Sequence, residues 1–291
     1  MTSPTRDGLL RRGALAIPYV EWHAEGDPVP PPVLLLHGLS SNARYWDRVA
    51  SHLPHRRRVA LDLTPADPAD ATMAELIADV AYAIRELGLG SPVVVGHSWG
   101  AALALEFVVA NPELTSGFVF VDGPIHGVAR IFSWDEVQAR MQPPFRRYAS
   151  AAEAIADSRA YLGEAWADDL EPYVEAGLRL DGDGLIAKLT SPVRLRILRD
   201  IHDSDPEQLW PKVTVPASAL IARKSDAKIS RSTDEGMTRI AEIAPAIKIQ
   251  RFETPHDIPL YAPADVAREI ELIAARAASA SPSPPVAPPR R

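Results

Sequence analysis

The sequence predicts an α/β protein built around a mostly parallel β-sheet. Between residues 33 and 121, short apolar runs alternate with helix-forming stretches, and the alternation resumes at residue 217. The runs are unbroken, as expected for strands that are buried on both faces of a parallel sheet. One run leads through a glycine-flanked turn directly into a helix-favouring stretch. Strands that alternate with helices favour parallel neighbours joined by right-handed crossovers.

The strands are predicted from apolar runs that end at proline, glycine or aspartate. A proline-rich turn follows the first run, because proline cannot take part in a sheet ladder. Residues 1–12 are polar, and we expect them to be loose. The expected strands are residues 14–23, 33–36, 58–61, 93–95, 118–121, 217–222 and 247–252.

The helices are predicted from apolar spacing and from terminal signals. Thr72 and Glu75 have the spacing of a capping box, and apolar residues follow them at helical intervals. Gly88 marks the end of that helix. The expected helices of the core are residues 43–53, 73–87, the stretch from the glycine-flanked turn to about 111, 232–244 and 263–277.

Residues 125–214 interrupt the alternation, because several helix starts follow one another without an apolar strand between them. The helix starts are two capping-box patterns and a serine–proline pair, at Ser133 with Glu136, Ser150 with Glu153, and Ser191 with Pro192. We therefore predict a core domain of residues 1–124 and 215–277, a helical cap of residues 125–214, and a disordered tail at residues 278–291, rich in proline, serine and alanine.

Composition restricts the function. The chain has 291 residues and a net charge of −7, from 31 basic and 38 acidic side chains, which argues against a nucleic-acid or anionic-membrane binder. It contains no cysteine, so disulfides, cysteine metal sites and thiol catalysis are excluded. No secretory signal, membrane span, metal-ligand spacing or phosphate loop is evident. We expect a cytoplasmic monomer or homodimer with a small-molecule substrate, no metal and no cofactor.

The central motif is Gly96-His97-Ser98-Trp99-Gly100, which follows an apolar β-branched run and precedes small helix-favouring residues. This is the strand–turn–helix setting of a nucleophile elbow. The glycines remove side chains that would collide in a sharp turn. Ser98 then lies at the tip of the turn, and the Trp99 N–H lies at the helix N-terminus, where it can stabilise an oxyanion.

A serine hydroxyl needs a base within hydrogen-bond reach, and the base needs an acid that fixes its tautomer. His256 follows the last predicted strand and is the expected base. Two aspartates are candidates for the acid. Asp226 follows the strand at 217–222 and is favoured, whereas Asp122 ends the strand at 118–121 and is the alternative.

These residues resemble the α/β-hydrolase fold family. The order Ser98, Asp226, His256 matches the family order of nucleophile, acid and base. Residues 37–39, His-Gly-Leu, resemble its oxyanion loop. The resemblance covers residues 14–277 and implies an eight-stranded, mostly parallel sheet flanked by helices, with a helical cap between the sixth and seventh strands. It further implies that the N–H groups of Leu39 and Trp99 form the oxyanion hole.

Within the family, Ser98 argues against haloalkane dehalogenases and most epoxide hydrolases, which carry aspartate at the elbow. The chain resembles the small serine esterase, lactonase and perhydrolase members. We expect a hydrolase that cleaves a carboxylic ester, lactone or thioester of a small apolar substrate, contacted by Trp46, Trp134 and Trp166. Two alternatives stay open: non-hydrolytic cyclisation or rearrangement at the same site, and a ligand-binding protein with little turnover.

Overall fold

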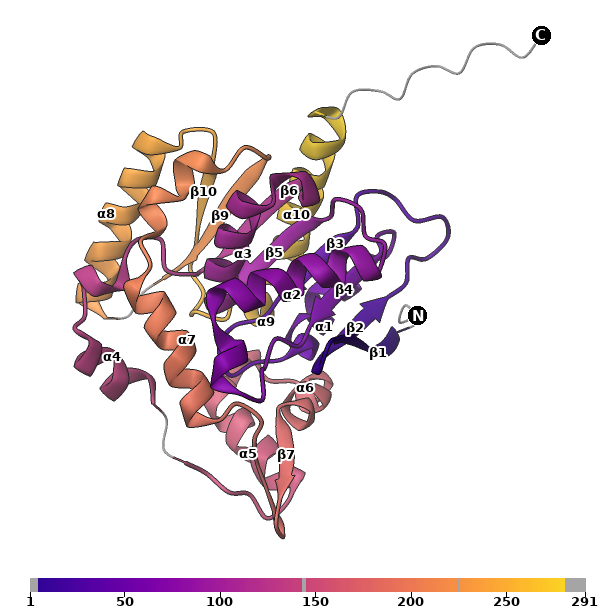
Figure 1. Ribbon diagram of the computed structural model, residues 1–291, viewed down its shortest axis with the longest axis vertical. Helices are drawn as coiled ribbons and strands as arrows, with labels where there is room; N and C mark the ends of the chain where they lie inside the picture. The colour runs from indigo at the N-terminus through magenta and orange to yellow at the C-terminus, as the bar shows by residue number, and fades with distance from the viewer. Residues whose placement is uncertain (1–4, 143–144, 224–225, 281–291) are drawn as a thin grey trace.

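The computed structural model describes residues 5–142, 145–223 and 226–280. Its main sheet has eight strands in the order β1-β2-β4-β3-β5-β6-β9-β10, and all neighbours are parallel except those of β2 (Figure 1). The mostly parallel eight-stranded sheet is therefore confirmed. The strands are β1 (Thr5–Arg12), β2 (Leu15–Trp22), β3 (Val33–Leu36), β4 (Arg58–Leu61), β5 (Val93–His97), β6 (Gly117–Val121), β9 (Ala217–Ala222) and β10 (Lys248–Phe252).

Helices cover both faces of this sheet. Helices α2, α3 and α8 contribute to the apolar core on one face, and α1, α9 and α10 contribute to the core on the other. Strands β3, β4, β5, β6 and β9 are buried on both sides, which explains their short unbroken apolar runs. The helices of the core are α1 (Asp47–Ser51), α2 (Met73–Glu86), α3 (Trp99–Ala110), α8 (Ala227–Ile243), α9 (Ile258–Tyr261) and α10 (Pro263–Ala280).

The N-terminal segment forms strand β1, so the expectation of a loose segment is wrong for residues 5–12. β1 pairs antiparallel with β2 at the edge of the sheet. Its polar sequence suits an edge strand, where charged side chains discourage pairing with other chains. Arg12 also forms ion pairs with Glu75 and Asp79 of α2, which tie the strand to the core.

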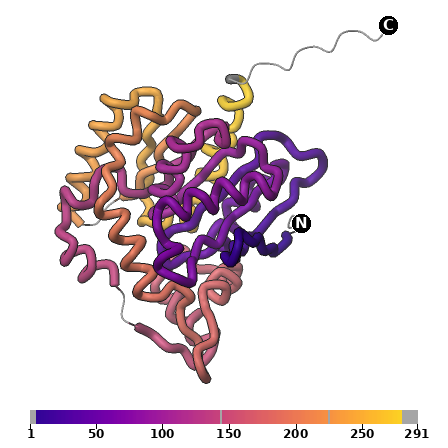
Figure 2. Tube along the Cα trace, viewed as in Figure 1, coloured from indigo at the N-terminus to yellow at the C-terminus, as the bar shows by residue number. Residues whose placement is uncertain are grey.

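The insertion, residues 125–214, lies between β6 and β9, which are the sixth and seventh strands of the main sheet. It runs beside the layers of the core and below them in the view of Figure 2. Its α-helices are α4 (Trp134–Met141), α5 (Ala151–Leu162), α6 (Glu171–Ala176) and α7 (Ser191–Asp203). Short 3-10 helices occur in both parts of the chain: η1 (Ala43–Trp46), η2 (Pro68–Ala71), η3 (Pro112–Leu114), η4 (Val128–Arg130), η5 (Gly163–Ala165), η6 (Asp168–Leu170), η7 (Pro206–Gln208) and η8 (Trp210–Lys212).

The insertion also contains a hairpin of β7 (Leu178–Asp181) and β8 (Gly184–Ala187), although no strand was predicted there. Each strand has four residues and β7 is largely exposed, so neither carries the apolar run of a buried strand. The signal for the hairpin is the Gly182-Asp183 turn, in which Gly182 has a φ of 61°.

Helix α7 joins the insertion to the core. Val193 and Ile197 are buried in the core cluster on the side of α2 and α3. Asp200 accepts a hydrogen bond from the backbone N–H of Met73, the first residue of α2. Apolar burial and this capping contact together fix α7 on the core.

Residues 278–280, which were predicted to belong to the tail, are part of α10. Residues 281–291 of the predicted tail lie outside the described residues. None of the helices in the described part of the chain combines the length and the apolar character needed to cross a membrane.

Candidate active site

The turn between β5 and α3 holds Ser98 in an uncommon backbone conformation. Its φ is 55° and its ψ is −119°, a region that side chains with a Cβ rarely adopt. The flanking glycines are required by space. A Cβ on Gly96 would lie 2.7 Å from the Cα of Ala101, and one on Gly100 would lie 2.8 Å from the carbonyl carbon of Leu36. The sequence thus produces the strained turn expected of an elbow, with Ser98 half-buried at its tip.

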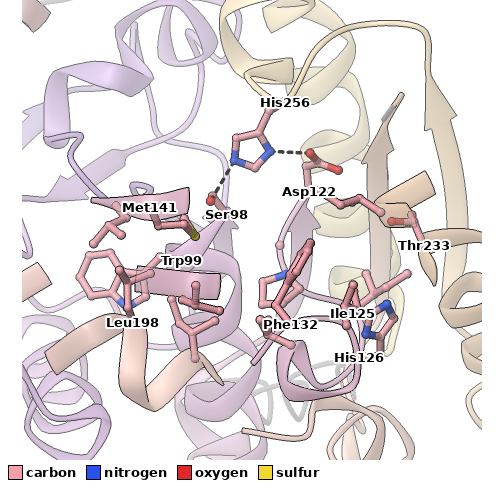
Figure 3. Close-up of a pocket in the computed structure, with 18 of the residues that line it drawn as sticks. Ser98, Trp99, Asp122, Ile125, His126, Phe132, Met141, Leu198, Thr233 and His256 are labelled. Carbon is pink, nitrogen blue, oxygen red and sulfur yellow. Dashed lines mark hydrogen bonds and ion pairs between the residues drawn. The ribbon is translucent and has the colours of Figure 1, made fainter. Parts of the chain in front are cut away.

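Three side chains meet at the tip of this turn. The Oγ of Ser98 donates to Nε2 of His256 over 2.9 Å, and Nδ1–H of His256 donates to Oδ2 of Asp122 over 2.6 Å. Figure 3 shows the imidazole between the hydroxyl and the carboxylate. His256 comes from the loop after β10, as expected. The arrangement has the geometry of a nucleophile, a base and an orienting acid.

Asp122 is the acid of this arrangement, so the preference for Asp226 is corrected. Asp226 is the N-cap of α8, and its Oδ1 accepts from the backbone N–H groups of Lys228 and Ile229. Its other oxygen lies 3.5 Å from Arg140. Asp226 therefore caps the N-terminus of α8 and does not orient His256. These bonds hold the pKa of Asp226 below its usual value, with the Ile229 N–H the largest cause.

Two aromatic residues, His97 and Tyr45, hold the loop that carries His256. Nε2–H of His97 donates to the carbonyl oxygen of His256 over 3.0 Å, and the hydroxyl of Tyr45 donates to Oδ1 of Asp257 over 3.0 Å. The rings of Tyr45 and His97 stack with their centroids 4.9 Å apart. Burial is the main cause that raises the pKa of Tyr45 well above its usual value, so this hydroxyl stays protonated. No pattern in the sequence predicts either contact.

The expected oxyanion loop follows β3. His37 is buried, its Nδ1–H donates to the carbonyl oxygen of Gly38 over 2.8 Å, and its Nε2 accepts from the Leu63 N–H over 3.0 Å. These bonds fix the loop from inside. Leu39 and Trp99 both line a cavity that contains Ser98. Trp99 is the first residue of α3, where backbone N–H groups have no acceptor within the helix.

An apolar cavity of about 320 Å³ opens from Ser98 and His256 toward the insertion. Both the core and the insertion contribute to its wall (Figure 3). Its apolar lining side chains include Leu39, Ile125, Phe132, Met141, Leu198, Ile201 and Ile229. A cavity of this size and lining suits an aliphatic or aromatic group of a small molecule.

A second cavity, of about 630 Å³, also reaches Ser98 and His256. Its wall is more polar and comes from the loop after β3, the loop after β10 and the insertion. The polar side chains that line it include Ser40, Arg140, Arg146, Tyr148, Tyr173, Arg194 and Asp257. Burial is the main cause that raises the pKa of Tyr173 to about 12. The nucleophile thus lies at the junction of an apolar and a polar cavity.

The three tryptophans predicted to contact substrate line neither cavity, which corrects that prediction. Trp46 is fully buried in the core between the sheet and α1. Trp166 packs against the same core and lies under Arg159. Trp134 contacts His202 at 5.7 Å between ring centroids. All three pack against other side chains of the protein. Trp99 is the tryptophan that lines the apolar cavity.

Comparisons of sequence agree with the fold. A profile of the alpha/beta hydrolase family matches residues 33–269. Lipase LipV of Mycobacterium tuberculosis is 32% identical over 157 residues, which are 53% of this chain and 58% of the lipase. Epoxide hydrolase 3 of Mus musculus is 30% identical over 141 residues, which are 42% of this chain and 37% of that enzyme. The match thus spans less than two thirds of either relative.

Solved structures cover nearly the whole chain at lower identity. A thioesterase domain from the curacin biosynthetic pathway has a TM-score of 0.75 and 17% identity, covering 92% of this chain and 100% of that domain. E-2-(acetamidomethylene)succinate hydrolase also has a TM-score of 0.75, with 18% identity, covering 93% of this chain and 99% of that enzyme. At these identities the likeness is one of fold. The family match covers most of the sequence, and the chain therefore belongs to the alpha/beta hydrolase family of enzymes.

Proposed function

We propose that the protein is a cofactor-free serine hydrolase that cleaves a carboxylic ester, lactone or thioester through an acyl-enzyme. The observation that carries this proposal is the pair of hydrogen bonds through His256, 2.9 Å to Ser98 and 2.6 Å to Asp122. Membership of the hydrolase family supports the general class. The names of the relatives, a lipase and a thioesterase domain, agree with acyl transfer.

In the first step, Oγ of Ser98 attacks the carbonyl carbon while Nε2 of His256 takes the hydroxyl proton. The resulting imidazolium is stabilised by Asp122, which keeps Nδ1–H directed at its carboxylate. The bond from the carbonyl carbon to the leaving oxygen or sulfur then breaks, and His256 returns the proton to that atom. An ester or thioester gives an acyl-serine and a neutral alcohol or thiol, whereas a lactone gives an acyl-serine that carries the new hydroxyl on its own chain.

In the second step, water attacks the acyl carbon as His256 takes one of its protons. The ester bond to Ser98 breaks, the proton passes to Oγ, and the carboxylic acid leaves. Each tetrahedral intermediate carries an oxyanion, which we assign to the N–H groups of Leu39 and Trp99. Such fixed donors stabilise charge that develops only in the transition state.

A serine nucleophile favours acyl substrates over epoxides. Opening an epoxide with Ser98 would form an ether, which has no carbonyl carbon for water to attack. An acyl-serine, in contrast, keeps a carbonyl carbon that water can attack, with Ser98 as the leaving group. We therefore keep the epoxide hydrolase relatives as evidence of family only. We further propose that the insertion acts as a cap, because its side chains line both cavities at Ser98.

The proposal is tested with an activity-based probe and a substrate screen. A fluorophosphonate should modify wild-type protein once, and Ser98→Ala should abolish the adduct in intact-mass analysis. The same variant should lose hydrolysis in a screen of 4-nitrophenyl esters, lactones and thioesters. An adduct that persists in Ser98→Ala, or hydrolysis that does not depend on Ser98, would refute the proposal. Binding of the compounds without turnover would favour a ligand-binding protein.

A further inference from the structure

The polar cavity contains three arginines, and their surroundings differ. Arg140 lies 3.5 Å from Asp226, and Arg146 pairs with Asp157. Arg194 pairs with no carboxylate in the described part of the chain. The residues outside that part contain no Asp or Glu, so no acidic side chain there can pair with it.

Arg194 is held at the wall of the polar cavity by neutral partners. Its guanidinium donates to the backbone carbonyl of Met141 over 3.2 Å and to the hydroxyl of Ser40. Ser40 follows Leu39, so the guanidinium is fixed one residue from a proposed oxyanion donor. A guanidinium has five N–H donors, and these two bonds leave others for a ligand.

The position of Arg194 is electrostatically costly for the free protein. The residue lies near the N-terminal end of α7, where the helix dipole repels a cation. The first turn of α7 contains no acidic residue that would compensate the charge. Burial is the cause that lowers the pKa of Arg194 from its usual value. A partly buried cation with three unfavourable features is best explained by an anion that it binds.

We propose that the substrate carries a carboxylate on one arm of its scissile ester or thioester and that Arg194 binds this carboxylate in the polar cavity. The other, apolar arm occupies the cavity of about 320 Å³. This inference rests on the proposed function of Ser98. One unpaired cation matches a monoanion better than a phosphate dianion. Asp257 also faces the cavity but accepts from Tyr45, and the protonated tyrosines there are further donors.

The test compares charged and neutral substrates of matched shape. Mono-4-nitrophenyl glutarate is paired with 4-nitrophenyl pentanoate, and 4-carboxyphenyl butyrate with 4-methylphenyl butyrate, so each arm carries the carboxylate in one pair. In at least one pair, Arg194→Gln should lower the ratio of kcat/KM for the charged over the neutral ester by about 10- to 100-fold. Arg199→Gln is the matched control, because Arg199 lies on the same helix but pairs with Asp203.

The outcomes separate this inference from the proposed function. Unchanged ratios in both pairs, or an equal loss for charged and neutral esters, would overturn the inference and leave Arg194 as a support of the Ser40 loop. Selective loss with 4-phosphonooxyphenyl butyrate alone would replace the carboxylate by a phosphate and also overturn it. Binding is measured in parallel on Ser98→Ala by calorimetry, where Arg194→Gln should weaken only the charged ester. Hydrolysis that persists in Ser98→Ala would instead refute the proposed function.

Discussion

Asp122 holds His256 with a carboxylate that is itself fixed at both oxygens. Oδ2 accepts from Nδ1–H of His256 over 2.6 Å, and Oδ1 accepts from the backbone N–H of Ala222 over 2.8 Å. Ala222 is the last residue of β9, so the acid at the end of β6 is oriented by the neighbouring strand. The side chain of Asp122 is 1% exposed, which leaves the carboxylate little freedom to turn.

Asp122→Asn should lower kcat on the best ester substrate by about 10³- to 10⁴-fold, because an amide cannot hold the imidazole in the tautomer that accepts from Ser98. Steady-state kinetics of the purified variant would measure this loss. Asp226→Asn is the control and should change kcat less than about threefold, since Asp226 caps α8. The opposite ranking of the two variants would restore Asp226 as the acid.

The choice between these aspartates shows what the sequence could not supply. Both follow a strand, and both strands lie on the same side of β5 in the sheet. The orientation of Asp122 toward His256 depends on a tertiary contact, the hydrogen bond that its carboxylate accepts from the Ala222 N–H. Neither local sequence predicts this contact. Asp226 did carry a usable signal, because an aspartate before a helix is a good N-cap. Starting α8 at 227 instead of 232 would have assigned Asp226 to that role.

The buried strands were predicted well because strands that are buried on both faces have unbroken apolar sequences. Strands 33–36, 58–61 and 217–222 agree with β3, β4 and β9 at every residue. The exposed strand β1 and the hairpin in the insertion were missed, since neither contains an unbroken run of buried apolar residues. The residues that line the cavities could not be predicted from the sequence either. Tryptophan is common both in hydrophobic cores and in ligand sites, and the spacing of tryptophans in the sequence does not show which role each has.

The backbone at Ser98 predicts a conflict between stability and function. Its positive φ of 55° costs a residue with a Cβ about 1–3 kcal/mol, a cost that glycine avoids. Ser98→Gly should therefore be more stable than Ser98→Ala by about 1–2 kcal/mol in urea unfolding, while both variants lack activity. Both lose the bond to His256, so that contact cancels in the comparison.

A matched pair at Ser51 provides the control for this effect. Ser51 is exposed in α1 and is not among the described residues with positive φ. There glycine should be less stable than alanine by about 0.5–1 kcal/mol, because it gains no relief from strain and loses more chain entropy. Equal stability of the two Ser98 variants would show that the turn stores no strain.

The apolar cavity should set the preferred chain length of the substrate. Ile201 lines this cavity, and Ile201→Phe would fill part of its volume of about 320 Å³. We expect kcat/KM for hexanoyl esters to fall on the order of 10-fold relative to acetyl esters, or hexyl relative to methyl esters if the alcohol arm enters. Trp134→Ala removes a larger side chain outside the cavity and should leave the ranking unchanged. If the preference for chain length changed only in the Trp134→Ala control, Trp134 would be a substrate-contacting residue after all.

Stability should depend on pH through Asp47, the first residue of α1. Burial is the largest cause that raises the pKa of Asp47 from 3.8 to about 6, against the opposing charge of Arg44 3.7 Å away. A carboxyl group whose folded-state pKa is raised favours the folded protein only while it is protonated. Its contribution is therefore complete below about pH 4 and is lost as the pH rises through about 6.

Asp47→Asn keeps the shape of the side chain and removes this titration. A shift of about two pH units corresponds to about 3 kcal/mol, and the 27% exposure of the side chain reduces the expected effect to about 1–2 kcal/mol. The free energy of unfolding of the variant, relative to wild type, should rise by this amount between about pH 4 and about pH 8. Urea unfolding at the two pH values measures it. The exposed turn residue Asp183 provides the control, since Asp183→Asn should show no such rise; an equal rise in both variants would mean that burial of Asp47 is not the cause.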